Sequence, residues 1–187
     1  MKRLIDIVAS IILIILLSPV LLIITILLKC SEGGTVLFKQ KRVGLNNELF
    51  TIYKFRTLQE NIGDMATEDI DVEHQVLKIG KILRVTSLDE LPQLFNILNG
   101  TMSFVGPRPL IPAEKEIREL REQYGVYSVR PGMTGLAQIN GRDNLDYKEK
   151  ALLDREYVEN QSLAYDFKIV FKTFSKVLKR DDIKDGK

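Results

Sequence analysis

Hydrophobic positions follow three patterns along the chain, and each pattern predicts a different element. From Ile7 to Leu28 there are 22 residues without a charge, which as a helix would be about 33 Å long, enough to cross a hydrocarbon core of about 30 Å. Between residues 35 and 58 two stretches rich in β-forming residues flank the turn Gly44-Leu45-Asn46-Asn47, which predicts a β-hairpin. Beyond residue 75, short segments with helical spacing predict a series of helices.

The rest of the chain predicts a mostly helical body. Helices are expected at 76–83, 88–98, 113–124, 146–160 and 163–180, with a short strand at 102–105. Residues 58–75 are polar and predict no element, and residues 181–187 are expected to form a mobile tail. The predicted fold class is therefore α+β, with a membrane segment at 1–30 followed by one folded domain at 31–180.

The last predicted helix is amphipathic. Four lysines share one side, and six apolar residues, three of them phenylalanines, share the other. They are Lys168, Lys172, Lys176 and Lys179, against Phe167, Val170, Phe171, Phe174, Val177 and Leu178. This pattern fits a helix at a membrane surface, and it fits equally a core-packed helix with solvated lysines.

The apolar N-terminal segment is interrupted near its middle by Ser18-Pro19. Proline removes a helix hydrogen bond and clashes with the preceding turn, so a kink or a reversal is expected there. Basic residues precede and follow the segment, so positive charge does not select an orientation. From these residues alone a spanning helix is the simpler interpretation, and a re-entrant segment is the alternative.

Composition excludes several functions. The chain has 27 basic and 25 acidic residues, a balance that argues against a nucleic-acid binder dominated by phosphate contacts. One cysteine, Cys30, and one histidine, His74, cannot form an internal disulfide, a Cys/His zinc site or a serine–histidine triad.

Two adjacent carboxylates, Asp89 and Glu90, stand out in the stretch TSLDELPQLFN. Ser87 and Glu90 fit a capping box, but Pro92 would then interrupt the helix, so the helix could instead begin near Pro92. A helix start favours ionised carboxylates. Adjacent residues point about 100° apart on a helix, so one nucleophile and one Mg²⁺ ligand fit better than a shared proton.

Basic residues elsewhere are candidates for neutralising phosphates. The period of two in the second hairpin strand puts Lys54 and Arg56 on one face, and prolines on both sides of Arg108 restrict its direction. Arg84 precedes the carboxylates. The segment 129–144 contains several glycines, which allow backbone N–H groups to approach a phosphate. Each of these residues also has an ordinary structural explanation.

Five motifs in order, YKFRT, SLDELPQLFN, VGPRPL, VRPGMTGLAQINGR and LDREYVEN, follow the segment containing Ser18-Pro19. Together they resemble the bacterial sugar transferase family, the monotopic phosphoglycosyl transferases, and in particular its small members, over about residues 2–180. The resemblance implies transfer of a sugar-1-phosphate from a UDP-sugar to polyprenyl (undecaprenyl) phosphate, with release of UMP. It also implies a covalent phosphosugar intermediate on Asp89 and a Mg²⁺ cofactor associated with Glu90.

The resemblance assigns further residues to substrate binding. Lys54, Arg84, Arg108 and Asp154 match positions implicated in the family's active site, and the loop from Arg130 to Arg142, including Gly141, resembles part of a nucleotide pocket. Leu136 departs from the family, because many members have tryptophan there. Two other functions remain as alternatives: a non-catalytic membrane-anchored assembly subunit, and a metal-dependent hydrolase of nucleotide sugars.

The resemblance also reverses the topology favoured above. It implies a re-entrant helix–break–helix at Ser18-Pro19, interfacial amphipathic helices, and a catalytic domain on the cytoplasmic face of the bacterial inner membrane. The expected partners are the UDP-sugar, the polyprenyl phosphate and membrane lipid. A second copy of the chain or downstream glycosyltransferases are additional candidates.

Overall fold

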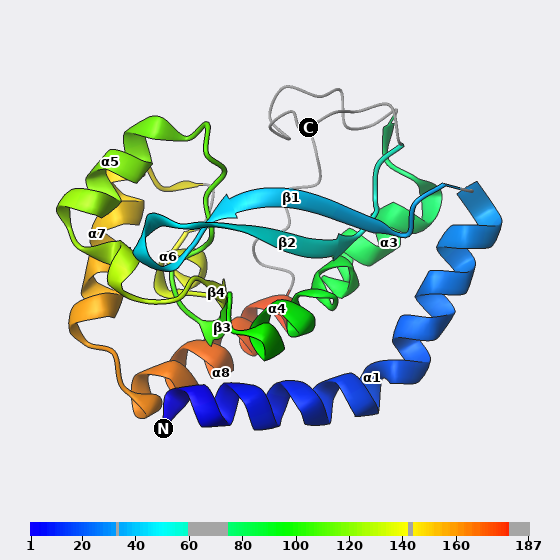
Figure 1. Cartoon of the computed structure of the whole chain (residues 1–187), viewed down its shortest axis with the longest axis horizontal. Helices are drawn as coiled ribbons and strands as arrows, with labels where there is room; N and C mark the ends of the chain where they lie inside the picture. The colour runs from blue at the N-terminus through cyan, green and yellow to red at the C-terminus, as the bar shows by residue number, and fades with distance from the viewer. Residues whose placement is uncertain (33, 60–74, 142–143, 180–187) are drawn as a thin grey trace.

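The structure is a computed structural model of the 187-residue chain, and it describes residues 1–32, 34–59, 75–141 and 144–179 (Figure 1). Of the residues singled out above, His74 and Arg142 lie outside the described residues, as do the predicted tail and Arg180. The fold is α+β and mostly helical, as predicted, with one long apolar helix at the N-terminus and two small sheets.

The N-terminal helix α1 (Lys2–Glu32) is continuous but bent. Figure 1 shows its two arms running in different directions, and Pro19 lies inside it. Proline has no N–H to donate to the carbonyl of Ile15, four residues earlier, and the Ser18 hydroxyl donates to that carbonyl instead, at 2.8 Å. The Ser-Pro pair therefore bends the helix while its freed carbonyl keeps a hydrogen bond.

Both arms of α1 pack against the rest of the protein. In the first arm Leu13, Ile14 and Leu17 contact a buried cluster around Ile97 and Met102. In the second arm Ile24 and Leu28 are themselves buried in a second cluster, which includes Phe55, Leu77 and Leu83. By length and composition α1 is the one helix among the described residues that could cross a membrane.

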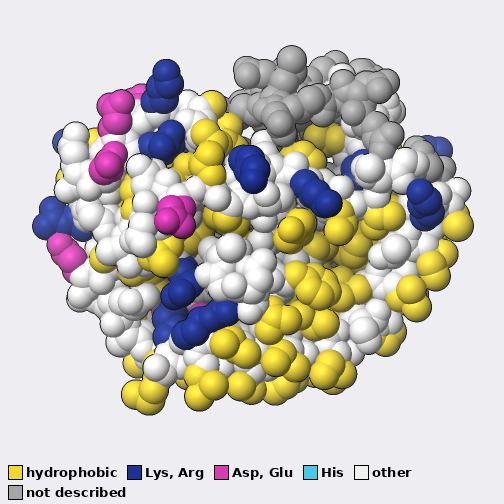
Figure 2. Space-filling model, in the orientation of Figure 1, with side chains coloured by type: hydrophobic (Ala, Val, Ile, Leu, Met, Phe, Trp, Pro, Cys, Tyr) yellow, Lys and Arg dark blue, Asp and Glu magenta, His cyan; other side chains and the backbone are white. Residues whose placement is uncertain are grey.

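The outer face of α1 is apolar and exposed. The exposed side chains include Leu4, Val8, Ile12, Ile15, Leu16, Leu22, Ile23 and Ile26. In Figure 2 hydrophobic side chains cover the lower and right-hand surface, where α1 runs in Figure 1. Such a large exposed apolar surface favours a membrane as its surroundings.

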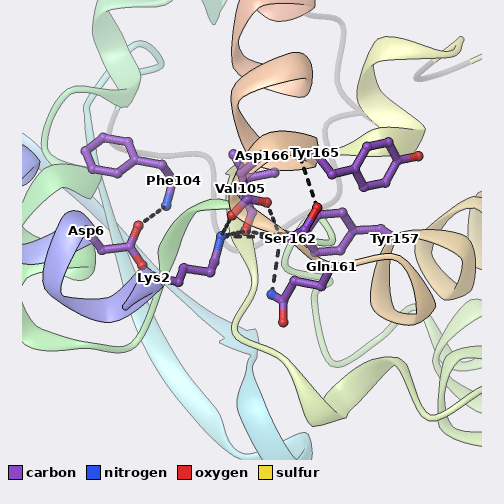
Figure 3. Close-up of polar contacts among 9 residues, drawn as sticks. All are labelled: Lys2, Asp6, Phe104, Val105, Tyr157, Gln161, Ser162, Tyr165 and Asp166. Atoms are coloured by element: carbon purple, nitrogen blue, oxygen red, sulfur yellow. Dashed lines mark hydrogen bonds and ion pairs between the residues drawn. The ribbon is translucent and has the colours of Figure 1, made fainter.

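Hydrogen bonds fix the start of α1 to the body (Figure 3). Lys2 pairs with Asp166 at 2.5 Å and donates to the carbonyl of Val105 at 3.1 Å. The buried Tyr157 hydroxyl donates to Asp166 at 2.7 Å, and Asp6 accepts from the backbone N–H of Phe104. The N-terminal turn is thus held by charged groups as well as by apolar packing.

The hairpin consists of β1 (Leu37–Val43) and β2 (Leu49–Phe55), antiparallel, joined through the 3₁₀ turn η1 (Leu45–Asn47). Its predicted position and turn are confirmed. Asn46 and Asn47 have positive φ there, a conformation that asparagine tolerates better than most residues. Since the strands alternate sides, Phe50 and Ile52 are buried against the core while Leu49 is exposed.

The remaining elements follow in chain order around the hairpin. They are α3 (Lys78–Val85), η3 (Leu88–Glu90), α4 (Gln93–Asn99), β3 (Ser103–Val105), α5 (Lys115–Gln123), η4 (Val126–Ser128), β4 (Gly132–Thr134), α6 (Leu136–Ile139), α7 (Tyr147–Glu159) and α8 (Leu163–Lys179). β3 and β4 form a second, parallel sheet. The predicted helices at α3, α5, α7 and α8 are confirmed, whereas β4 and α6 lie in a segment expected to be a loop.

Leu136, the residue that departs from the family pattern, is buried. It packs in a third core cluster with Val105, Ile139, Tyr157 and Ile169. Its position inside the protein indicates that it contributes to packing between α6 and α7 and does not itself face a membrane.

Candidate active site

The two carboxylates lie in the short turn η3, ahead of α4. Ser87 has φ 56° and its side chain makes no capping hydrogen bond, so the capping-box interpretation is wrong. Pro92 directly precedes α4, whose first residue is Gln93. The alternative prediction, a helix that begins near Pro92 with the carboxylates ahead of it, is confirmed. Asp89 and Glu90 therefore project from a 3₁₀ turn whose first flanking residue adopts a strained left-handed conformation.

A buried asparagine fixes this turn relative to the hairpin. Asn96 in α4 accepts a hydrogen bond from the N–H of Tyr53 at 3.0 Å and donates to the carbonyl of Thr51 at 2.8 Å. Both partners are backbone groups of β2, so α4 cannot slide along the strand without breaking them. Lys54, next to Tyr53, is thereby held opposite Glu90.

Glu90 and Lys54 form the central ion pair of the site, with Oε1 and Nζ 2.7 Å apart. Each side chain is 19% exposed, and both line a narrow cleft. Arg42, Gln93 and Arg108 also line this cleft, as do backbone and side-chain atoms of Pro109, Gly132 and Met133. Three cations therefore surround a single carboxylate, an arrangement suited to a ligand that carries several negative charges.

The pKa of Asp89 is shifted mainly by burial. Burial raises the pKa of the Asp89 carboxyl to about 6; Lys54 and Arg84 lower it, and Glu90 raises it further. The expectation that the helix start would favour its ionised form is thus corrected, because desolvation outweighs the turn's N–H groups. A carboxylate with a pKa near 6 is still mostly ionised at neutral pH, and its poor solvation makes it a better nucleophile.

Arg84, on α3, and Arg56, just beyond β2, have different surroundings. Arg84 donates from Nε to the Thr57 hydroxyl at 2.9 Å. Burial lowers the pKa of Arg84, and the nearby Asp89 opposes that shift. Arg56 is 7% exposed, and none of Asp89, Arg84 and Arg56 is among the residues that line the cleft beside Glu90. Arg84 is therefore the cation placed beside Asp89, whereas Arg56 is largely enclosed by protein.

Arg42 is a site residue that the sequence reasoning missed. It lines the cleft, donates to the carbonyl of Pro109 at 3.2 Å, and has its pKa lowered to about 10 by burial and by the positive charge of Arg108. Arg42 could have been found from the register of the hairpin. In the observed pairing Arg42 opposes Phe50, so the even-numbered residues of both strands, Arg42 and Lys54 among them, share one face. A register shifted by one residue would place Arg42 on the opposite face from Lys54, so the sequence alone did not identify it.

Arg108 and Asp154 are brought together indirectly. Asp154, on α7, is buried and binds Arg121 of α5, with Nε and Oδ2 2.8 Å apart. Arg121 in turn donates to the backbone carbonyl of Arg108 at 2.7 Å. Burial raises the pKa of Asp154, and Arg121 opposes this. The pair Arg121–Asp154 therefore supports the Pro107-Arg108-Pro109 loop from behind and does not open into the cleft.

Glycines of the segment 129–144 are required for close backbone packing, apart from any role in binding a ligand. A Cβ on Gly132 or Gly135 would lie 2.1 Å and 2.2 Å from backbone atoms of Gly106, so these glycines allow β3 and β4 to meet. Arg130 donates to the carbonyl of Gly100, at the end of α4 away from the carboxylates. Gly141 has φ 145° and lies against Leu145. Neither Arg130 nor Gly141 lines the cleft.

The residues of the site fit a Mg²⁺ ion that takes only one or two ligands from the protein. Among the described residues there is no group of three or more His, Cys, Asp or Glu side chains placed to hold a metal. Mg²⁺ commonly binds through one or two carboxylates, with water and substrate phosphates completing its shell. Asp89 and Glu90 could supply that small protein share, with Lys54 moving aside from Glu90.

Comparison with known proteins agrees with the geometry. The sequence model of the bacterial sugar transferase family matches residues 1–180 of this chain. The chain is 43% identical to a UDP-glucose:undecaprenyl-phosphate glucose-1-phosphate transferase of Klebsiella pneumoniae, with 94% of this chain and 39% of that protein covered. It is 39% identical to an undecaprenyl-phosphate galactose phosphotransferase of Salmonella typhimurium, with 97% and 41% covered.

A shorter relative, the exopolysaccharide production protein ExoY of Sinorhizobium fredii, is 39% identical, with 94% of this chain and 84% of that protein covered. The chain thus spans less than half of the two longer transferases and most of the shorter relative. The match over nearly all of its length shows that this chain is a member of the bacterial sugar transferase family.

Proposed function

We propose that the protein transfers a sugar-1-phosphate from a UDP-sugar to undecaprenyl or a similar polyprenyl phosphate, in two steps through Asp89. The observation that carries the proposal is the desolvated Asp89 beside an accessible Glu90, with Lys54, Arg42, Arg84 and Arg108 around them. A diphosphate donor needs this excess of positive charge. Relatives whose names specify undecaprenyl phosphate support the choice of acceptor.

In the first step a carboxylate oxygen of Asp89 attacks the phosphorus that bears the sugar. The bond from that phosphorus to the bridging oxygen breaks, UMP leaves, and the sugar phosphate is bound to Asp89 as an acyl phosphate. In the second step an oxygen of the polyprenyl phosphate attacks the same phosphorus. The bond to Asp89 breaks, which regenerates the carboxylate and gives a polyprenyl diphosphate sugar.

The other residues of the cleft orient and neutralise the phosphates. Arg108 and Arg42 lie together where a bidentate contact to a diphosphate can form. Lys54, released from Glu90 by the donor, would neutralise the transferred phosphate. Bound beside Glu90, Mg²⁺ would offset charge on the phosphate oxygens. The sugar is not specified, because the named relatives transfer both glucose and galactose.

The topology proposed with this function is re-entrant. Both arms of α1 pack on the same body, which supports a topology in which both ends of α1 stay on one side of the membrane. A membrane-spanning helix would instead carry one of its arms away from the body. We place the catalytic domain on the cytoplasmic face of the bacterial inner membrane, where the donor is expected. Tags before Met1 and after Lys187 should both be protected from reagents outside the cell.

A trapping experiment tests the chemistry. Purified protein with Mg²⁺ and UDP-sugar labelled in the sugar should form a labelled protein adduct without acceptor and release one UMP per site. Asp89→Asn should form none. Asp146→Asn is the matched control, because Asp146 is an exposed cap of α7 and asparagine caps about as well. An adduct that persists in Asp89→Asn would refute the assignment of the nucleophile.

Dependence on the acceptor separates transfer from hydrolysis. Adding polyprenyl phosphate should discharge the adduct and permit many turnovers of UMP release. Steady release of free sugar phosphate without acceptor would instead identify a hydrolase. Absence of UMP release with every donor would favour a non-catalytic assembly subunit.

A further inference from the structure

An apolar groove of about 550 Å³ lies between the second arm of α1 and the hairpin. Its walls include Leu21 and Thr25 of α1, Tyr53 and Phe55 of β2, and Pro92 and Phe95 around the start of α4. Its volume is within the roughly 300–1,000 Å³ typical of ligand sites. None of the lining residues is charged, and the Thr25 hydroxyl is already bonded to the carbonyl of Leu21 at 2.7 Å. The groove therefore offers almost only apolar contacts.

The groove and the catalytic cleft share the same two segments. In β2, Tyr53 and Phe55 line the groove while Lys54, between them on the other face, binds Glu90. In the turn before α4, Pro92 lines the groove only two residues after Glu90. One strand and one turn thus separate an apolar site from the carboxylates that we propose react with a phosphate.

The groove is also continuous with the membrane surface of α1. Leu22, which lines it, is 60% exposed, and its neighbours Ile23 and Ile26 are exposed on the same helix. Phe95, on the opposite wall, is 46% exposed. A lipid chain could therefore enter sideways from the membrane without crossing water, with its polar end toward the hairpin and α4.

We infer that this groove binds the isoprene units nearest the phosphate of the polyprenyl acceptor. This inference rests on the proposed function, since the acceptor identifies which lipid must bring a phosphate to Asp89. The occupant is then a branched isoprenoid chain joined directly to a phosphate that lies toward Lys54 and Arg84, whereas the acyl chains of a phospholipid are joined to their phosphate through glycerol. The groove would give the second step its selectivity for the lipid, while the cleft selects the nucleotide sugar.

Filling the groove tests the inference. Thr25→Phe places an aromatic ring in it and loses only a hydrogen bond within the helix. The control Ile23→Phe adds a ring to the exposed face of the same helix, outside the groove. Thr25→Phe should raise the KM for undecaprenyl phosphate at least about tenfold and leave adduct formation from the donor unchanged. Ile23→Phe should change neither.

A second variant, Phe95→Ala, removes one wall and should raise the same KM without affecting the adduct. A KM unchanged in both Thr25→Phe and Phe95→Ala would overturn the inference. So would a rise in Ile23→Phe as large as that in Thr25→Phe.

Photolabelling tests occupancy independently of turnover. A short polyprenyl phosphate with a diazirine on its first isoprene unit should label the peptide containing Leu21–Thr25 or that containing Tyr53. Undecaprenyl phosphate should compete, whereas phosphatidic acid should not. Equal competition by phosphatidic acid would mean that the groove takes any membrane lipid, which contradicts the inference. Labelling with no UMP release from any donor would show that the groove is correct and the proposed reaction wrong.

Discussion

Asp89 and Glu90 are neighbours in the sequence but have different surroundings. Glu90 is paired with Lys54 in an accessible cleft, whereas the pKa of Asp89 is raised to about 6 mainly by burial. The sequence predicted that the two residues would not act as one acid–base pair, because neighbouring residues point apart. It could not predict the desolvation of Asp89, which depends on how α3, the hairpin and η3 pack around it.

The buried charge of Asp89 should destabilise the protein at neutral pH. With the folded pKa near 6 and an unfolded value of 3.8, the folded state binds more protons between these values, so stability falls as pH rises through that window. Without divalent cations, Asp89→Asn should therefore be more stable than the natural protein at pH 8, by on the order of 2 kcal/mol, and equally stable near pH 3.5.

Thermal unfolding in detergent with chelator at both pH values measures this difference. Asp146→Asn, at the exposed cap of α7, should show no such dependence on pH. A difference of the same size at pH 3.5 and pH 8 would mean that the ionisation of Asp89 is not its cause.

The buried Arg121–Asp154 pair should contribute more to stability than an exposed ion pair does. Asp154→Asn leaves the buried Arg121 without its carboxylate, which typically costs about 3–5 kcal/mol. Glu159→Gln on the same helix breaks an exposed pair with Arg155 and should cost less than about 1 kcal/mol. Chemical denaturation of both variants checks this. Equal losses of stability in the two variants would contradict the prediction that an unpaired buried Arg121 is costly.

At the scale of elements, periodicity predicted what local sequence determines. The hairpin and the helices α3, α5, α7 and α8 were expected from the residues within each segment alone. β4 and α6, of three and four residues, were not expected, since they form only where Gly132 and Gly135 meet Gly106. Arg121 and Asn96 were likewise missed because their partners lie 33 and 45 residues away.

The bend in α1 should depend on Pro19. Pro19→Ala restores an N–H that can bond to the carbonyl of Ile15 and so favours a straight helix, which would pull one arm from the body. The natural protein should place both termini on one side of the membrane, and Pro19→Ala should place a fraction of molecules with the termini on opposite sides. Ser10→Ala serves as a control, because Ser10 makes the same type of backbone hydrogen bond within the helix away from the bend.

Accessibility of tags at the two ends in intact cells and in inverted vesicles measures this fraction. If Pro19→Ala leaves both termini on the same side, the packing of the two arms alone is sufficient for the topology, and the role given to Pro19 is wrong.

At the scale of the whole molecule, α1 and α8 together present an apolar surface. Lys2 binds Asp166 at the start of α8, so the two helices meet there. Phe167, Phe171 and Phe174 on α8 are between 64% and 77% exposed, which excludes the core-packed alternative for these side chains. Exposed aromatic residues between lysines are typical of helices at a membrane surface. α8 should therefore lie on the same bilayer as α1.

The chain contains no tryptophan, so a single substitution provides a specific fluorescent probe of this arrangement. Phe171 is 77% exposed on α8, so a tryptophan in its place should enter the bilayer. In vesicles the fluorescence of Phe171→Trp should therefore lie at a shorter wavelength than that of a tryptophan in water. It should also be quenched by lipids brominated on their acyl chains. Tyr147→Trp is the control: it lies at the start of α7, whose 13 residues extend roughly 20 Å from the junction with α8, and it should not be quenched. Quenching of both probes would place the body deeper in the bilayer than α1 and α8 alone require. Quenching of neither would leave α1 as the membrane contact and make the aromatic face of α8 a surface for another protein.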